Sequence, residues 1–418
     1  MRSRKGGWRY LSRMERFMPE RWRRIGLALG WALVGALAPL SVAYAYVTRV
    51  PGGGDFGMYY AAAEALRYAP HSAIYLTQSL DATVRAHGGC GSATLDPYPY
   101  QPLLALLLAP QTNFPCQSVE LVWFWLNIAL WLGMTVAYTA RSWRRNGSGQ
   151  ALLVALMALL FQPIILGITW GQIHLLILVS MLAGMWLVAR RWEYAGGAVL
   201  AVGAVLKYLP AFLVVYYLLR GRWKVALGAA ITALALTATQ TLIVGPQTML
   251  ASIGASAADI RYYANLNDGG DWMRALPGGV VIAYLASGVF VIVVVWLQWR
   301  KHTTNMRLGA SWSIVAALML TPLLWWYYLT WAHPALLTSL ESIGLALKAY
   351  PLARRATYAG LALSYILLDT TPFHLPPPVF RISAIGTLLL WLLCGALYTW
   401  SARLSSRLQP LARGSSYA

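Results

Sequence analysis

Long runs of apolar residues, separated by short polar segments, dominate this chain from about residue 25 to residue 400. A helix needs ~20 mostly apolar residues to cross a bilayer. The pattern therefore predicts an all-α polytopic integral membrane protein with about 12 transmembrane helices. The predicted spans lie at about 25–47, 118–140, 150–167, 173–189, 194–206, 208–220, 224–245, 277–298, 308–323, 329–346, 356–371 and 381–400.

Two larger polar and aromatic segments, at about 48–117 and 246–276, interrupt this pattern. Loops on a rigid helical scaffold commonly carry function, so we expect the functional residues in or beside these two loops. Residues 1–24 form a basic N-terminal segment, residues 25–400 a single multi-span domain that includes both loops, and residues 401–418 a tail.

Basic residues mark one side of the predicted topology. Most of the 33 Lys and Arg residues lie in residues 1–24, in short loops such as "RSWRR" and "RGRWK", and in the tail. The positive-inside rule then predicts a multi-pass plasma-membrane protein with both termini cytoplasmic and both large loops extracytoplasmic. The net charge of +20 does not indicate a nucleic-acid partner, because the charges are scattered between apolar spans that contact membrane lipids.

Residues 194–220 are apolar throughout but lie between two basic segments, so one helix cannot begin and end there on the same side. Either two half-length helices turn near Lys207 to Pro210, or there is one crossing and a neighbouring span is misassigned. The hairpin is favoured, because a turn in a hydrated cavity accommodates Lys207 and Pro210 can begin the second helix.

Two other apolar segments differ from ordinary spans. "QPLLALLLAP" at 101–110 is too short to cross and predicts a re-entrant or interfacial helix. The run after residue 24 follows arginines as a secretory signal does, but at about 23 residues it is too long for one and predicts an uncleaved first span.

The three cysteines indicate no metal centre. Cys90 and Cys116 fall in the first large loop, where an oxidising exterior permits a disulfide without requiring one. Cys394 falls in the last predicted span and is expected to be a packing residue. No Cys and His spacing resembles a zinc site, and we expect neither a metal nor another cofactor.

Asp55, in "VPGGGDFGMYYAAAEAL", follows the first span directly. A carboxylate held by glycines at the outer edge of a span can act as a general base toward a hydroxyl. Asp is also a favoured helix N-cap, and the residue types alone favour that structural role. The following segment predicts an interfacial helix with Tyr59 and Tyr60 at the level of the lipid headgroups.

Several ordered segments resemble a known family. "GGGDFGMYYAAAEALRYAPHSAIY", "YPYQPLLALLLAP", "WGQIHLLIL", "AGGAVLAVGAVLKYLPAFLVVYYLLRGRW" and "LTPLLWWYYLTWAHP" resemble, in order, segments of glycosyltransferase family 87 in the GT-C superfamily. The resemblance implies a GT-C fold and a membrane enzyme that moves a sugar from a polyprenyl-phosphate donor to a hydroxyl of a glycolipid or polysaccharide, with inversion. It also implies that Asp55 is the catalytic base.

The resemblance suggests further site residues. Lys207 is the first choice for the donor phosphate, although it could instead extend to the interface; Arg261 and His333 are placed at the phosphate rim. A sugar of the donor or acceptor would contact Tyr59, Tyr60, Gln172, His174, Trp326 and Tyr327. Ordinary interfacial placement explains several of these polar and aromatic residues equally well.

The chain departs from the family pattern at "WWYY" and "NLNDGGD". These segments fall where a headgroup would bind, so the donor sugar stays open between mannose, the family's commonest, and arabinofuranose. A lipid-linked-saccharide flippase or transporter is the alternative from another class. It would carry charges through the membrane midplane, whereas the polar clusters here fall near the outer face.

Overall fold

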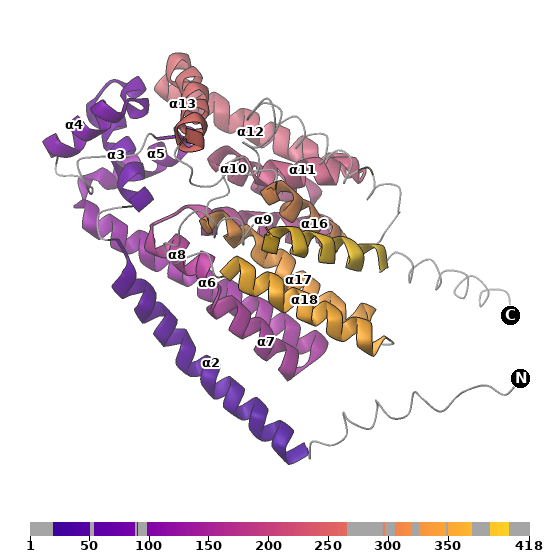
Figure 1. Ribbon diagram of the computed structural model, residues 1–418. Coiled ribbons are helices and arrows are strands. Elements are labelled where there is room, and N and C mark those ends of the chain that lie inside the picture. The colour runs from indigo at the N-terminus through magenta and orange to yellow at the C-terminus, as the bar shows by residue number, and fades with distance from the viewer. Residues whose placement is uncertain are drawn as a thin grey trace, which may run out of the picture.

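A computed structural model describes residues 20–50, 54–87, 90, 98–265, 296, 306–319, 326–347, 350–369 and 385–400. Within these ranges the chain forms helices and no strand (Figure 1). The predicted all-helical fold is therefore confirmed for the described part of the chain.

Among the described residues, four helical segments are long and apolar enough to cross a membrane. They are α2 (Glu20–Thr48), α6 (Cys116–Asn146), α7 and α8 together (Ser148–Leu159 and Gln162–Thr169), and α12 (Trp223–Val244). The chain is thus an integral membrane protein by helix length and composition, while the count of twelve spans stays a prediction.

Shorter helices fill most of the remaining predicted spans. They are α9 (His174–Ala189), α10 (Glu193–Leu206), α11 (Pro210–Leu219), α16 (Met306–Met319), η4 (Trp326–Ala332), α17 (His333–Ala346), α18 (Pro351–Asp369) and a last helix, Ile385–Trp400. The predicted span at about 277–298 lies outside the described residues, apart from residue 296.

The predicted break between α10 and α11 is present. Lys207 adopts an extended conformation (φ −160°, ψ 129°) directly after α10, and Pro210 is the first residue of α11. An ion pair between Glu193 and Arg222 joins the start of α10 to the start of α12. Because α11 ends just before α12 begins, α10 and α11 run out and back, and the hairpin is confirmed with Lys207 at its tip.

One end of the helical bundle collects basic residues. Arg141 at the end of α6 pairs with Glu341 of α17 at 3.1 Å, and Arg145 and Arg307 act electrostatically on the same carboxylate. Arg222 contacts the sulfur of Met306 at 3.7 Å. Basic loops that are far apart in the sequence therefore meet at one end, which we call the basic end.

The opposite end carries a cap of helices, which lie together in Figure 1. The predicted short helix at 101–110 is present as α5 and the start of η3, and the second predicted loop is helical up to Asn265. The cap consists of α3 (Gly54–Tyr68), η2 (His71–Tyr75), α4 (Thr77–His87), α5 (Leu103–Leu108), η3 (Ala109–Asn113) and α13 (Pro246–Asn265).

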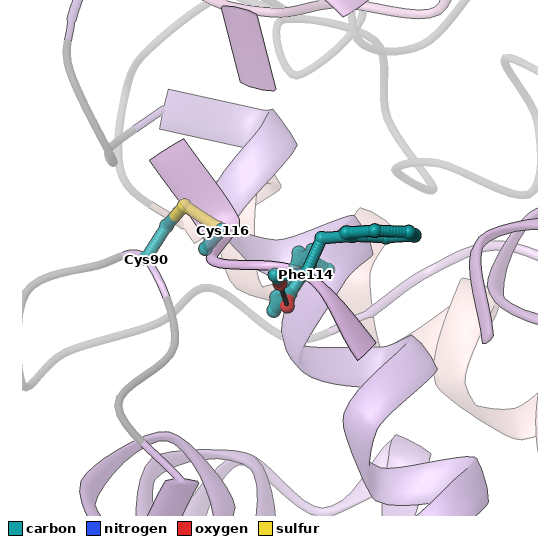
Figure 2. Close-up of a disulfide and its surroundings, with 4 residues drawn as sticks. Cys90, Phe114 and Cys116 are labelled. Atoms are coloured by element: carbon teal, nitrogen blue, oxygen red, sulfur yellow. Dashed lines mark hydrogen bonds between the residues drawn. A yellow bond between two sulfur atoms is a disulfide. The ribbon is translucent and has the colours of Figure 1, made fainter. Parts of the chain in front are cut away.

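A disulfide between Cys90 and Cys116 ties this cap to the first residue of α6 (Figure 2). The two Cα atoms lie 5.4 Å apart, within the usual range for a disulfide. Beside it, the carbonyl of Phe114 accepts a hydrogen bond of 2.7 Å from Tyr60 of α3. The disulfide therefore ties the start of α6 to the segment after α4, and the hydrogen bond holds the residues before α6 against α3.

Helices α10 and α12 pack through glycines. A Cβ atom at Gly197 would lie 2.9 Å from the backbone nitrogen of Ala229 and would overlap the carbonyl of Val225. Small residues allow membrane helices to approach this closely, and van der Waals packing then contributes much of their association. This contact fixes the hairpin, and so the position of Lys207.

We predict that Gly197→Ala destabilises the protein by about 1–3 kcal/mol, because the added methyl group forces the two backbones apart. The apparent melting temperature of the purified protein in detergent measures this effect. Gly133→Ala in α6 is the matched control, since a Cβ there meets no atom within 4 Å. Equal melting temperatures for the two variants would contradict the close α10–α12 packing.

Candidate functional site

Asp55 lies at the N-terminal end of α3, which docks against the turn between α8 and α9. The backbone N–H of Asp55 donates a hydrogen bond of 3.1 Å to the carbonyl of Trp170. Gly54 and Gly171 both have φ near +65°, and a Cβ at Gly171 would lie 2.6 Å from the Cβ of Phe56. Only glycine permits both this backbone conformation and this approach.

The helix bounds place Asp55 inside the first turn of α3 rather than at the cap position. A carboxylate there interacts favourably with the positive end of the helix dipole. Its side chain remains partly exposed, whereas nearly all of the following helix is buried. Dipole stabilisation is therefore one structural role of Asp55, in a residue that stays partly exposed.

Lys207 projects from the tip of the hairpin into a group of aromatic rings. Its ammonium nitrogen lies 3.3 Å from the hydroxyl of Tyr100 and 4.2 Å from the ring centre of Tyr328. The ring centres of Tyr327 and Trp331 are 5.9 and 6.0 Å away. Cation–π attraction at these distances stabilises the charge in a partly desolvated place.

The same nitrogen lies 3.2 Å from Nε2 of His174. An ammonium group only donates hydrogen bonds, so Nε2 must accept, which makes His174 neutral with its hydrogen on Nδ1. The ring centres of Tyr327 and Trp331 lie 4.6 and 4.7 Å from that of His174, and Trp331 donates a hydrogen bond to the His174 carbonyl. The imidazole is thus held in one orientation.

Tyr59 connects the two parts of the site. It lies one helical turn after Asp55, and its buried hydroxyl is 3.2 Å from the hydroxyl of Tyr100, which contacts Lys207. Burial raises the pKa of Tyr59 well above its usual value, and the nearby charge of Asp55 raises it further. Tyr59 is therefore protonated at neutral pH, and the charge of the Asp55 carboxylate influences its pKa.

Two buried donors in the α8–α9 turn lack a hydrogen-bond partner among the described residues. They are Nε2 of Gln172 and Nδ1 of His174, in side chains that are each 1% exposed. Gln172 accepts from Tyr59 at 3.3 Å through its other amide atom, Oε1. Buried donors usually have partners. Their position beside Asp55 and Lys207 suits oxygen atoms of a ligand.

The remaining predicted site residues are placed differently. The hydroxyl of Tyr60 donates to the carbonyl of Phe114, and both Tyr59 and Tyr60 are buried in protein. The ring of His333 lies among the aromatic side chains of α6 and the α7–α8 break, and neither of its nitrogens has a hydrogen-bond partner among the described residues. The side chains of Arg261 and Trp326 lie outside the described part of the chain.

The sequence analysis assigned no role to Tyr100 or Tyr328, although both contact Lys207. Tyr100 lies in the "YPYQP" segment, and Tyr328 follows Tyr327 in "WWYY". In both segments tyrosines cluster near a proline, and this clustering is the sequence feature that could have identified Tyr100 and Tyr328 as site residues. Within the described ranges, no group of three or more His, Cys, Asp or Glu side chains is placed to hold a metal ion.

The sequence profile of glycosyltransferase family 87 matches residues 98–324, more than half of the chain. The chain belongs to glycosyltransferase family 87. No curated protein and no solved structure matches it. Membership identifies the protein as a membrane glycosyltransferase, in agreement with its apolar helices.

The matched range of this family 87 glycosyltransferase contains Tyr100, Gln172, His174 and Lys207 and begins after Asp55. Lys207, Tyr100 and the α8–α9 turn therefore lie within the family match, whereas Tyr327, Tyr328 and Trp331 follow its end. Asp55 joins the α8–α9 turn through the backbone hydrogen bond to Trp170.

We predict that Gly171→Ala destabilises this glycosyltransferase and lowers sugar transfer. The substitution adds a left-handed strain of about 1–2 kcal/mol and a clash with Phe56 that displaces the start of α3. Gly221→Ala is the matched control, because Gly221 also has a positive φ (+74°) but no neighbouring atom within 4 Å of its Cβ. Melting temperature and turnover should both fall further for Gly171→Ala; equal losses would contradict the docking role of Gly171.

Proposed function

We propose that this glycosyltransferase moves a sugar, with mannose as the favoured donor sugar, from a polyprenyl phosphate to a hydroxyl of a glycolipid or polysaccharide. Transfer takes place on the extracytoplasmic face, with inversion at the sugar carbon. The observation that carries this proposal is the contact between Tyr59 and Tyr100, which joins the helix of Asp55 to Lys207 at one end of the bundle.

In this proposal Asp55 is the general base. Its carboxylate takes the proton of the acceptor hydroxyl, whose oxygen forms a bond to the anomeric carbon from the face opposite the phosphate. The bond from that carbon to the phosphate oxygen breaks, and its electron pair stays on the phosphate. Glycosidases generally need a second carboxylate to protonate a poor leaving group, whereas a phosphate leaves as a stable anion.

Lys207 is the proposed partner of the departing phosphate. The surrounding rings lower the local dielectric, so the attraction between the ammonium and the phosphate is stronger than in water. This attraction grows as negative charge develops on the phosphate, which lowers the barrier to transfer. Nε2 of Gln172 and Nδ1 of His174 are available to donate to phosphate or sugar oxygens.

Tyr59 and Tyr327 are kept as proposed sugar contacts, since aromatic rings suit the apolar faces of a sugar. Arg261, Tyr60 and Trp326 remain proposed contacts from the family resemblance alone. His333 is not part of the proposed phosphate site, because its ring packs against Phe161 and Tyr138, with centre distances of 5.5 and 6.2 Å.

Two independent features support an extracytoplasmic active site. The basic end of the bundle is expected on the cytoplasmic side by the positive-inside rule, and the site lies at the opposite end. The disulfide between Cys90 and Cys116 belongs to the site end, and disulfides persist in oxidising compartments. Both termini are accordingly proposed to be cytoplasmic, in the plasma membrane.

We predict that Asp55→Asn lowers transfer by about 10² to 10⁴, because it removes the basic carboxylate while retaining the size of the side chain. The assay uses purified protein in proteoliposomes, labelled polyprenyl-phosphate-mannose as donor and an alkyl mannoside as acceptor. Asp81→Asn on α4 is the control and should retain turnover. More than about a tenth of wild-type turnover in Asp55→Asn would contradict the base assignment.

Lys207→Met should weaken donor binding as well as turnover, by about tenfold or more, because the ammonium contacts the phosphate already in the ground state. Equilibrium binding of the labelled donor measures the effect on affinity. Steady-state kinetics, with kcat and KM determined separately, measure the effect on turnover. Unchanged donor affinity would place the phosphate elsewhere. Parallel assays with polyprenyl-phosphate-arabinofuranose decide the sugar, and no transfer from either donor would overturn the proposed function.

The sidedness has its own test in intact cells, with a membrane-impermeant thiol reagent. Cys394→Ser with the Cys90–Cys116 disulfide intact provides a background free of other thiols. We expect exposed Ser72→Cys in the cap to react and exposed Arg144→Cys at the basic end to stay unlabelled until the cells are opened. Labelling of Arg144→Cys in intact cells would reverse the orientation.

A further inference from the structure

A series of hydrogen bonds connects the ammonium of Lys207 to the side-chain amide of Gln172. The ammonium lies 3.3 Å from the hydroxyl of Tyr100, which is 3.2 Å from the hydroxyl of Tyr59. That hydroxyl lies 3.3 Å from Oε1 of Gln172. The side chains of both tyrosines and of Gln172 are buried, so the series runs through protein.

The charge of Lys207 gives this series a direction. An ammonium only donates hydrogen bonds, so the oxygen of Tyr100 accepts from it. The hydrogen of Tyr100 then turns away from the positive charge and can be donated to the oxygen of Tyr59. Tyr59 donates its own hydrogen to Oε1 of Gln172. Each hydroxyl therefore accepts once and donates once within the series.

The opposite direction suits these groups less well. If Tyr59 donated its one hydrogen to Tyr100, Gln172 would have to turn its amide so that Nε2 faced Tyr59. Tyr100 would then accept from both neighbours, and its own hydrogen would have no acceptor within the series. The structure has Oε1 toward Tyr59, in agreement with the direction that Lys207 favours.

Gln172 has little freedom apart from the orientation of this amide. Its backbone N–H donates to the carbonyl of Gly167 at 2.8 Å, and Trp123 donates to the carbonyl of the preceding Gly171 at 2.9 Å. With Oε1 held by Tyr59, Nε2 is the amide atom left to meet a ligand. It has no hydrogen-bond partner among the described residues, and a buried donor of this kind is costly to leave unpaired.

The same ammonium also sets the second unpartnered donor of this turn. It lies 3.2 Å from Nε2 of His174, which must accept, so the imidazole hydrogen is on Nδ1. Lys207 thus acts on His174 directly and on Gln172 through two tyrosines. In both cases the atom left without a partner in the described part of the chain is a donor, which suits an oxygen of a ligand.

We propose that Tyr59 is a positioning residue that orients the Gln172 amide, so that Nε2 donates to an oxygen of the lipid donor. This inference rests on the proposed function. The oxygen belongs to the phosphate or to the sugar, since both accept from an amide N–H. Without the Tyr59 hydroxyl the amide is able to turn, and its own oxygen would then face the ligand oxygen and repel it.

A double-mutant cycle on donor binding tests this role, with labelled polyprenyl-phosphate-mannose and purified protein in lipid nanodiscs. Tyr59→Phe keeps the ring and removes the hydroxyl, whereas Gln172→Met keeps the length of the side chain and removes both amide atoms. We expect each change to weaken binding about tenfold. The double variant should also lose about tenfold, because the hydroxyl acts through the amide. A loss of about a hundredfold in the double variant, or wild-type affinity in Tyr59→Phe, would overturn the proposal.

Polyprenyl phosphate without the sugar identifies the contacted oxygen. Weaker binding of both lipids to Gln172→Met assigns the oxygen to the phosphate, and weaker binding of the mannosylated lipid alone assigns it to the sugar. Tyr59→Phe should reproduce whichever pattern Gln172→Met shows. A different pattern in Tyr59→Phe would show that its hydroxyl does not act through Gln172 and would overturn the proposal.

Tyr365→Phe is the matched control, because it removes a hydroxyl that also donates to a protein acceptor, the carbonyl of Met157, outside this series. It should bind both lipids as the wild-type protein does. Equal losses in Tyr365→Phe and Tyr59→Phe would indicate a general loss of structure and overturn the positioning role. The proposed function fails on a different result, a wild-type protein that binds the lipid donor but transfers no sugar from it. A wild-type protein that binds neither lipid would overturn both.

Discussion

The backbone hydrogen bond between Asp55 and Trp170 fixes the geometry on which the whole site depends. It holds the start of α3 against the turn that also carries Gln172 and His174. Glycines on both sides, Gly54 and Gly171, allow the two backbones to meet, since any side chain at Gly171 would collide with Phe56. A carboxylate and two buried donors are thereby brought together before any substrate binds, which is the preorganisation that catalysis requires.

The second constraint is the break between α10 and α11, which places Lys207 at the tip of the hairpin. Two half-length helices place a charged residue at a tip within an apolar domain, and the glycine contact between α10 and α12 holds that tip in place. Aromatic rings then surround the ammonium, which stabilises its charge and limits access of water. The resulting cation lies at the opposite end of the bundle from Arg141 and its basic neighbours.

The sequence allowed the local features of this arrangement to be predicted. Lys207, three residues before Pro210 in an apolar run that lies between two basic segments, indicated the hairpin. A second apolar run, too short to cross a bilayer, indicated the helix at 101–110. The glycines before Asp55 drew attention to this carboxylate at the edge of a span, and the apolar runs indicated a helical membrane protein. Each of these signals comes from residues close together in the chain.

The long-range contacts could not be read in this way. Tyr100 and Lys207 are 107 residues apart, and only the folded structure shows that their side chains meet. His333 shares the aromatic and polar character of the site residues, yet its ring faces Phe161 in the bundle. Tyr59 and Tyr60 are buried by contacts with residues distant in the sequence, such as Tyr100 and Phe114, which their residue type does not indicate.

An experimental structure with polyprenyl phosphate bound in a lipid environment tests the central claim most directly. The account predicts the phosphate within hydrogen-bonding distance of the ammonium of Lys207, between the hydroxyl of Tyr100 and the α8–α9 turn, with Asp55 facing the same space. A phosphate bound at the basic end, beside Arg141 or Arg145, would contradict it.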